Sequence, residues 1–173
     1  LLALALRAPG LGYSEFCGDE LDATSLSLRA IRGEDFALFA NRKGPVQTVL
    51  PAAVWLLADT MTETVTRLPF LLAGLGGVLV CYLATRGVCR ARVGAAVTGT
   101  LVAVNGYLIA FSRMAQYQAI VFFLGMLACW SVWEMHRRKQ YALSAIGAVL
   151  FAVALLAHFD AIVFLPAILL VAV

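Results

Sequence analysis

Charged residues are scarce in this chain. They make up 13% of its 173 residues, and 62% are hydrophobic, whereas an average soluble domain is about a quarter charged and roughly half apolar. The basic residues stand in short, separated clusters without the broad basic face that nucleic acid requires, so nucleic acid is not an expected partner. The composition therefore excludes an ordinary soluble domain and indicates a protein whose solvent is mostly lipid.

Cysteines are few and follow no metal-binding or disulfide pattern. The four cysteines, at 17, 81, 89 and 129, form no Cys-x-x-Cys pair and stand at no Cys/His spacing. Cys81 and Cys129 also fall inside long apolar segments. The sequence thus predicts neither a disulfide framework nor a zinc site.

The two ends lack the marks of a chain start and a chain stop. The sequence opens on Leu1 without an initiator methionine, and residues 1–20 lack the basic start of a secretory signal. It closes on an apolar run, residues 161–173, with no stop signal. We therefore expect a piece truncated at both ends, in which residues 1–7 are the end of a first membrane helix.

What the chain does have is a series of long apolar segments. A membrane-spanning helix needs about 20 apolar residues, with a lower limit of about 17, to cross roughly 30 Å of hydrocarbon. Helices fit such segments because hydrocarbon offers no hydrogen-bond partner to an open backbone group. The predicted fold is therefore an all-α polytopic transmembrane bundle that forms part of a single domain. The predicted spans are residues 68–84, 93–111, 117–133, 140–157 and, at the start of a fifth, 161–173.

Two short basic loops predict the orientation of this bundle. They lie two crossings apart, so they share one side, which the positive-inside rule makes cytoplasmic. Residues 8–67 and the turns at 112–118 and 158–160 then face the periplasm or the exterior, and we expect the plasma (inner) membrane. The basic residues of the two loops are Arg86, Arg90, Arg92, Arg137, Arg138 and Lys139.

The long outer loop, residues 8–67, is expected to contain interfacial helices. Leu21–Ile31 has apolar residues near helical spacing with polar residues between them, which predicts an amphipathic helix. Val46–Ala58 is apolar but contains Pro51 and has only about 13 residues, too few for a full crossing. We expect this second segment to lie in or dip into the outer interface.

The outer loop also carries residue types that catalysis uses. Asp19 and Glu20 are adjacent carboxylates, and one of them could serve as a general base. The alternative is that both are N-terminal helix charges favoured by the helix dipole. Arg42 and Lys43 precede a Gly-Pro turn and could hold a phosphate, or they could simply anchor the chain to lipid headgroups.

Two further outer turns hold polar residues. One contains Arg113 and Gln118, and the other contains His158 and Asp160. Ionisable groups at membrane depth are costly, so they are functional candidates by default. The structural alternatives are snorkelling for Arg113 and a mutual hydrogen bond for His158 and Asp160.

Taken in order, these stretches resemble the GT-C glycosyltransferases related to dolichyl-phosphate-mannose protein mannosyltransferases and the bacterial aminoarabinose transferase, often called family 39. The resemblance covers essentially the whole chain, including the family's Asp-Glu motif in the first outer loop. The stretches that carry it are Leu6-Arg-Ala-Pro-Gly-Leu11, Gly18-Asp-Glu20, Lys43-Gly-Pro45, Arg67-Leu-Pro69, Ser112-Arg113 with Gln116-Tyr-Gln118, and His158-Phe-Asp160.

The resemblance implies transfer of a sugar from a polyprenyl-phosphate-linked donor to a protein, lipid or glycan acceptor on the outer face, with inversion at the anomeric carbon. Asp19, with Glu20 beside it, would be the catalytic base or acceptor-positioning carboxylate. The basic residues Lys43, Arg67 and Arg113 would neutralise the lipid-linked phosphate as it leaves.

The remaining candidates for substrate binding are Gln118, His158 and Asp160. Many relatives carry an aspartate where this chain has Gln118, so a second acidic role, including binding of a divalent metal, is left open and no cofactor is defined.

Two other classes of function compete with the transferase. A transporter or flippase-type protein could grip a lipid-linked sugar with the same cations and would not need Asp19 to titrate. A structural membrane subunit would use the polar turns only as anchors. A carboxylate pair and the Lys43-Gly-Pro45 turn in one loop favour the transferase.

Overall fold

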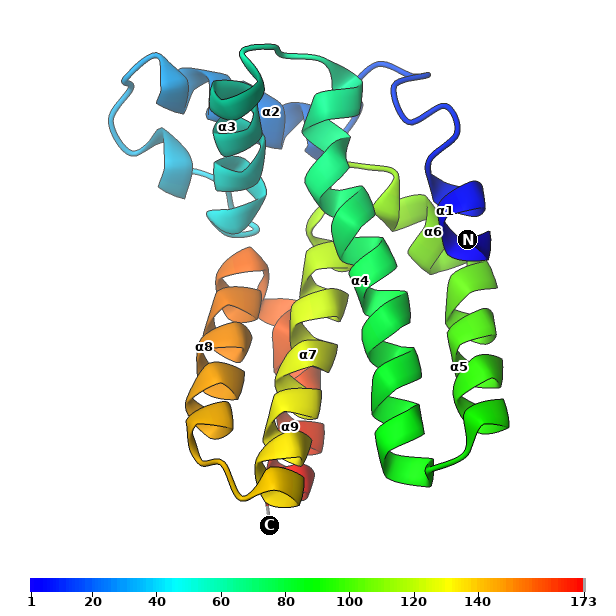
Figure 1. Ribbon diagram of the computed structural model, residues 1–173. Helices are drawn as coiled ribbons and strands as arrows, with labels where there is room; N and C mark the ends of the chain where they lie inside the picture. Colours follow the sequence, from blue (N-terminus) through cyan, green and yellow to red (C-terminus); the bar gives the residue numbers. More distant parts are fainter. Residues whose placement is uncertain (173) are drawn as a thin grey trace.

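The regular structure of the described part of the chain is helical. The computed structural model describes residues 1–172, and every regular element in that part of the chain is an α-helix or a 3-10 helix (Figure 1). This confirms the predicted all-α class. Val173, the last residue of the predicted fifth span, lies outside the described residues.

Within residues 1–172, two helices are each long and apolar enough to cross a membrane. They are α4 (Glu63–Cys89) and α7 (Tyr117–Arg138), which contain the predicted spans 68–84 and 117–133. Glycine lets these two helices approach closely. A Cβ added at Gly76 would lie 2.7 Å from the Phe123 side chain, and one at Gly77 would lie 2.9 Å from Phe122.

The predicted span 93–111 is not one continuous helix, which corrects the sequence prediction. It is divided into α5 (Arg92–Val104) and α6 (Gly106–Ser112), and the two axes differ by 60°. The reason lies in Asn105, whose side-chain oxygen accepts a hydrogen bond from the Leu108 N–H at 3.0 Å. This contact caps a new helix and replaces the backbone bond that would continue the old one. The pair forms a broken span or a re-entrant segment.

The last apolar segments are shorter than a full crossing. Helix α8 (Ala142–Ala157) has 16 residues, which gives a length of about 24 Å against roughly 30 Å of hydrocarbon. The predicted fifth helix does not begin directly at residue 161. A 3-10 stretch, η2 (Phe159–Phe164), comes first and α9 (Leu165–Ala172) follows.

The expected outer loop is a helical cap over one end of the bundle (Figure 1). It contains α2 (Asp19–Ile31), η1 (Ala37–Phe39) and α3 (Val46–Ala58), and it follows the short helix α1 (Leu2–Arg7). The helix predicted at 21–31 is confirmed and begins two residues earlier. The short helix predicted at 46–58 is also confirmed, and its place at a membrane interface stays a prediction.

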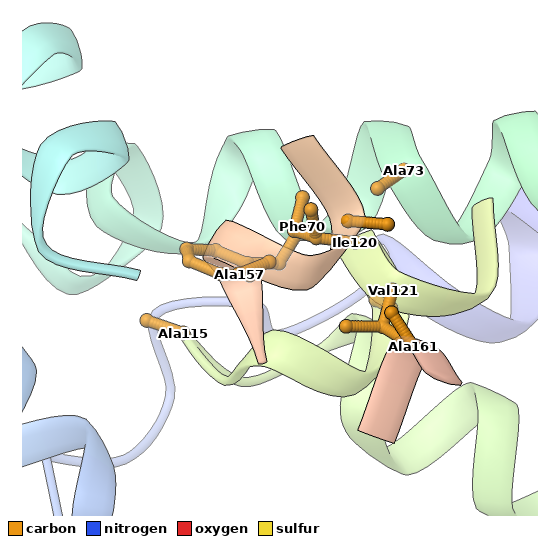
Figure 2. Close-up of a cluster of buried hydrophobic side chains, with 9 residues drawn as sticks. Phe70, Ala73, Ala115, Ile120, Val121, Ala157 and Ala161 are labelled. Carbon is orange, nitrogen blue, oxygen red and sulfur yellow. The ribbon is translucent and has the colours of Figure 1, made fainter. Parts of the chain in front are cut away.

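The core lies beneath this cap, where α4, α7, α8 and η2 meet (Figure 2). Small side chains dominate it, which allows close approach of the helix backbones. Large apolar side chains instead cover the outer faces of the helices, for example Leu79 and Leu101, as expected for surfaces that contact lipid. The buried core residues are Phe70, Ala73, Ala115, Ala119, Ile120, Val121, Ala154, Ala157 and Ala161.

Both basic loops lie at the end of the bundle opposite the cap (Figure 1). Arginines from the two loops line one shared pocket, so the two loops share one side, as predicted. Which side of the membrane this is remains a prediction from the positive-inside rule.

Two native cysteines can test that orientation. Cys17 is exposed in the cap and Cys89 is exposed at the end of α4, whereas Cys81 is buried and Cys129 is half-buried. With Cys81 and Cys129 changed to alanine, a membrane-impermeant maleimide should label Cys17 in intact cells and label Cys89 only after permeabilisation. The reverse pattern would overturn the predicted orientation.

Candidate functional site

The predicted base and the predicted phosphate ligand form an ion pair. Asp19 is the first residue of α2, and its Oδ2 accepts a hydrogen bond from the Lys43 Nζ. Both side chains are half-exposed. The Asn41 side chain holds the Lys43 backbone by accepting from its N–H at 3.0 Å, so the lysine projects from an ordered turn.

The turn after Lys43 requires a glycine at position 44. Its φ is +134°, a conformation that other residues rarely adopt. A Cβ at this position would also meet the carbonyl oxygens of Leu156 and Ala157 at the end of α8. The glycine therefore brings Lys43 against the end of α8, where the His158 turn begins.

The ion pair lies on the wall of a polar cleft of about 620 Å³ between α2 and the turn before α3. This volume is within the usual range for a small-molecule site. The residues that line it are Asp19, Asp22, Ser25, Leu26, Ala40, Asn41, Arg42 and Lys43.

An aromatic group joins the ion pair to the His158 turn. The Lys43 Nζ lies 5.6 Å from the centroid of the Tyr117 ring, a cation–π distance. The Tyr117 hydroxyl donates to Asp160 Oδ2 at 3.2 Å, and the His158 ring stacks on Tyr117 with centroids 3.7 Å apart. The structure thus brings Asp19, Lys43, His158 and Asp160 together.

Sequence reasoning did not select Tyr117 as a site residue, although it stands within the Gln116-Tyr-Gln118 stretch. An aromatic residue between two polar ones at the start of a predicted span was the available signal.

Glu20 and Arg67 form a buried, doubly hydrogen-bonded ion pair. The two N–H···O distances are both 2.8 Å, and the side chains are 0% and 3% exposed. Glu20 Oε1 also accepts from the Ala115 N–H at 2.7 Å. Arg67 further donates to the backbone oxygens of Leu11 and Glu15 at 2.8 and 3.3 Å.

These contacts leave neither side chain available to a substrate. The predicted roles of Glu20 as a catalytic carboxylate and Arg67 as a phosphate ligand do not fit this geometry. Together the two residues tie α2, α4 and the turn before α7 into one unit.

The Arg113 side chain does not reach the Asp19–Lys43 ion pair or the cleft. Its guanidinium donates to the backbone oxygens of Arg7 and Gly10 at 3.1 and 3.4 Å, and it is not among the residues that line the cleft. We therefore leave Arg113 out of the proposed site. The buried Arg7 in turn donates to the Ala103 oxygen at 2.7 Å, at the open end of α5.

Gln118 lies in the first turn of α7 and is half-buried. Its Oε1 is buried and has no hydrogen-bond partner within residues 1–172. Across the same residues, no group of three or more His, Cys, Asp or Glu side chains is placed to hold a metal ion.

Comparison with known proteins gives no match: no family model, curated protein or solved structure matches this chain. Function must therefore be inferred from the site itself.

Breaking the buried Glu20–Arg67 ion pair should strongly lower the stability of the fold. Glu20→Gln would leave the Arg67 charge buried without its partner, at a cost of about 3–5 kcal/mol in the free energy of unfolding. The double change Glu20→Gln with Arg67→Gln should recover part of this loss, because no buried charge remains. Glu15→Gln, an exposed change in the same segment, is the control, and thermal unfolding in detergent is the measurement. Equal loss in the single and double variants would contradict this account.

The burial of His158 should make the stability of the fold depend on pH. Burial lowers its pKa below the ordinary 6.5; the neighbouring Asp160 opposes this effect and Lys43 adds to it. The folded state therefore binds fewer protons than the unfolded state, so stability is lost as the pH falls below about 6.5. His158→Asn keeps an acceptor for the Asp160 N–H but cannot be protonated.

The measurement is the change in melting temperature between pH 7.5 and pH 5.5. The wild type should lose more than His158→Asn does. A wild type that instead gains stability over this range relative to the variant would show that attraction to Asp160 outweighs burial.

Proposed function

We propose that this chain is part of a GT-C-type membrane glycosyltransferase that transfers a sugar from a polyprenyl-phosphate-linked donor. Its site would face the periplasm or exterior at the plasma (inner) membrane, and its acceptor would be a protein, lipid or glycan. The observation that supports the proposal is the pairing of Asp19 with Lys43 on the wall of a polar cleft. A proton acceptor and a phosphate ligand in contact are what such a transfer needs.

In this proposal Asp19 is the base. Its carboxylate takes the proton from an acceptor hydroxyl while that oxygen bonds to the anomeric carbon of the sugar. The bond between that carbon and the phosphate oxygen breaks, and polyprenyl phosphate leaves with the bonding electrons. The Lys43 ammonium offsets the charge that develops on the leaving phosphate.

The ion pair suggests that the donor binds before Asp19 acts on the acceptor. With no donor bound, the Asp19 carboxylate is engaged by Lys43 and is not free to contact an acceptor hydroxyl. A donor phosphate competes with Asp19 for the ammonium, because both are anions that one flexible lysine side chain can reach. Binding of the donor would thus release the carboxylate for the acceptor.

Tyr117, His158 and Asp160 suit the sugar end of a donor. Asp160 is 52% exposed and can accept hydrogen bonds from sugar hydroxyls in addition to the one from Tyr117. Stacking between His158 and Tyr117 holds the aromatic pair in place. These groups adjoin Lys43, so phosphate and sugar contacts would be continuous.

A transporter or flippase for a lipid-linked sugar is the second candidate. The observation in its favour is again the ion pair, because a carboxylate held by lysine can release and recapture that lysine as a headgroup passes, without chemistry. Membrane lipids would be its partners as well.

The test compares two aspartates that line the same cleft. In the complete protein, Asp19→Asn should bind the carrier lipid but lose transfer by about 10²- to 10⁴-fold, the usual contribution of a general base. Asp22→Asn is the control, since Asp22 lines the cleft without an ion pair within residues 1–172. Lys43→Ala should weaken both donor binding and transfer. The measurements are donor binding and turnover with a radiolabelled polyprenyl-phosphate sugar.

Normal transfer by Asp19→Asn together with impaired Lys43→Ala would favour the transporter. Loss of transfer in both aspartate variants would show that the cleft needs its charge and does not single out Asp19 as the base.

A further inference from the structure

A second polar site lies at the other end of the bundle, where the ends of α4 and α7 meet the start of α5. It is a hollow of about 460 Å³, next to a second one of about 430 Å³ that shares Arg90 and Arg137. The charged residues that line the larger hollow are Arg86, Arg90, Arg92, Glu134, Arg137 and Arg138.

A buried carboxylate organises part of this cluster. Glu134 accepts from Arg137 at 2.6 Å and from Arg138 at 2.5 Å. In contrast, Arg86, Arg90 and Arg92 make no ion pair and no side-chain hydrogen bond within residues 1–172. Five guanidinium groups and one carboxylate leave four positive charges around a single hollow, an arrangement that attracts an anion.

Uncharged donors in the same hollows also lack partners. Trp130 lines the larger hollow and Trp133 the smaller one, and the indole N–H of each is buried without an acceptor in the described chain. Gly87 lines both hollows beside these groups, and a Cβ there would lie at ordinary contact distance, 3.8 Å from the Trp133 Nε1 and 4.0 Å from the Glu134 Oε1. An anion with several oxygens would meet both kinds of donor.

The surroundings indicate where the anion comes from. Along α4 there are exposed apolar side chains that suit acyl chains: Val88 on the wall of the smaller hollow and Leu79 farther along the helix toward the cap. Tryptophans beside arginines are typical of the membrane–water interface, and basic pockets between membrane helices on the cytoplasmic side bind acidic headgroups.

We propose that this end of α4 and α7 binds the phosphate of an anionic phospholipid in the same leaflet, such as phosphatidylglycerol. Arg86, Arg90 and Arg92 contact the phosphate oxygens, and the Trp130 and Trp133 N–H groups donate to phosphate or glycerol oxygens. The lipid would brace the α4–α5 turn against α7. The inference requires only that the bundle spans a membrane, and it is independent of the proposed transferase site.

The test uses a double variant that removes charge at little structural cost. Arg90 is the C-cap of α4 with a φ of +52°, where glycine is favoured over other residues, and Arg86→Gln keeps a good helix former. The matched control, Arg29→Gln with Arg32→Gln, removes the same charge from the exposed end of α2 in the cap.

Native mass spectrometry in a neutral detergent measures retention of phosphatidylglycerol and phosphatidylcholine with the same acyl chains. The wild type should prefer phosphatidylglycerol by at least about tenfold, from two or more arginine contacts. Arg86→Gln with Arg90→Gly should lose that preference, and the control should keep it. If circular dichroism shows that the double variant has lost helical structure, the test is repeated with Arg90→Gly alone. This single variant should lose part of the preference for phosphatidylglycerol.

Three results would overturn the proposal. One is equal retention of the two lipids by the wild type. Another is the same loss in the control as in the site variant, which would indicate general charge attraction. The third is displacement of phosphatidylglycerol by an equal concentration of inorganic phosphate, which would make this a small-anion site rather than a lipid site.

Discussion

The buried contact between Glu20 and Arg67 is the interaction on which the cap depends. One carboxylate and one guanidinium join α2 to α4, and the same carboxylate holds the Ala115 backbone before α7. Such a pair has a high desolvation cost and is stable only when nearly every lone pair and proton is satisfied. Here the remaining donors of Arg67 reach the Leu11 and Glu15 oxygens, so the segment before α2 is fixed as well.

The candidate site follows from that anchor by helix geometry. Successive residues on a helix point about 100° apart, so burying Glu20 turns its neighbour Asp19 toward the cleft, where Lys43 meets it. The Gly44 turn and the Tyr117 ring then connect this pair with the His158 turn. Two adjacent carboxylates thus receive opposite environments, and only one of them remains open to a ligand.

Apolar length and local spacing were enough to predict most of the helices, because lipid-facing segments of 17 or more residues have few alternatives. They could not predict the break at Asn105, which depends on one side chain competing with the backbone. The sequence likewise placed Asp19 and Lys43 in one loop but could not separate Asp19 from Glu20. That choice depends on Arg67, 47 residues from Glu20, and it is decided only when the helices pack.

The contact between Arg7 and Ala103 has a consequence for how the protein is made. The two residues are 96 positions apart, so at about 5–20 residues per second the arginine is synthesised roughly 5–20 seconds before its acceptor exists. During that interval the hydrogen-bond partner already in place for the guanidinium is the Ala3 oxygen of its own helix, at 3.3 Å, and the Val102 and Ala103 oxygens follow later. We therefore expect α1 to reach its final position only after α5 and the break that follows it have formed.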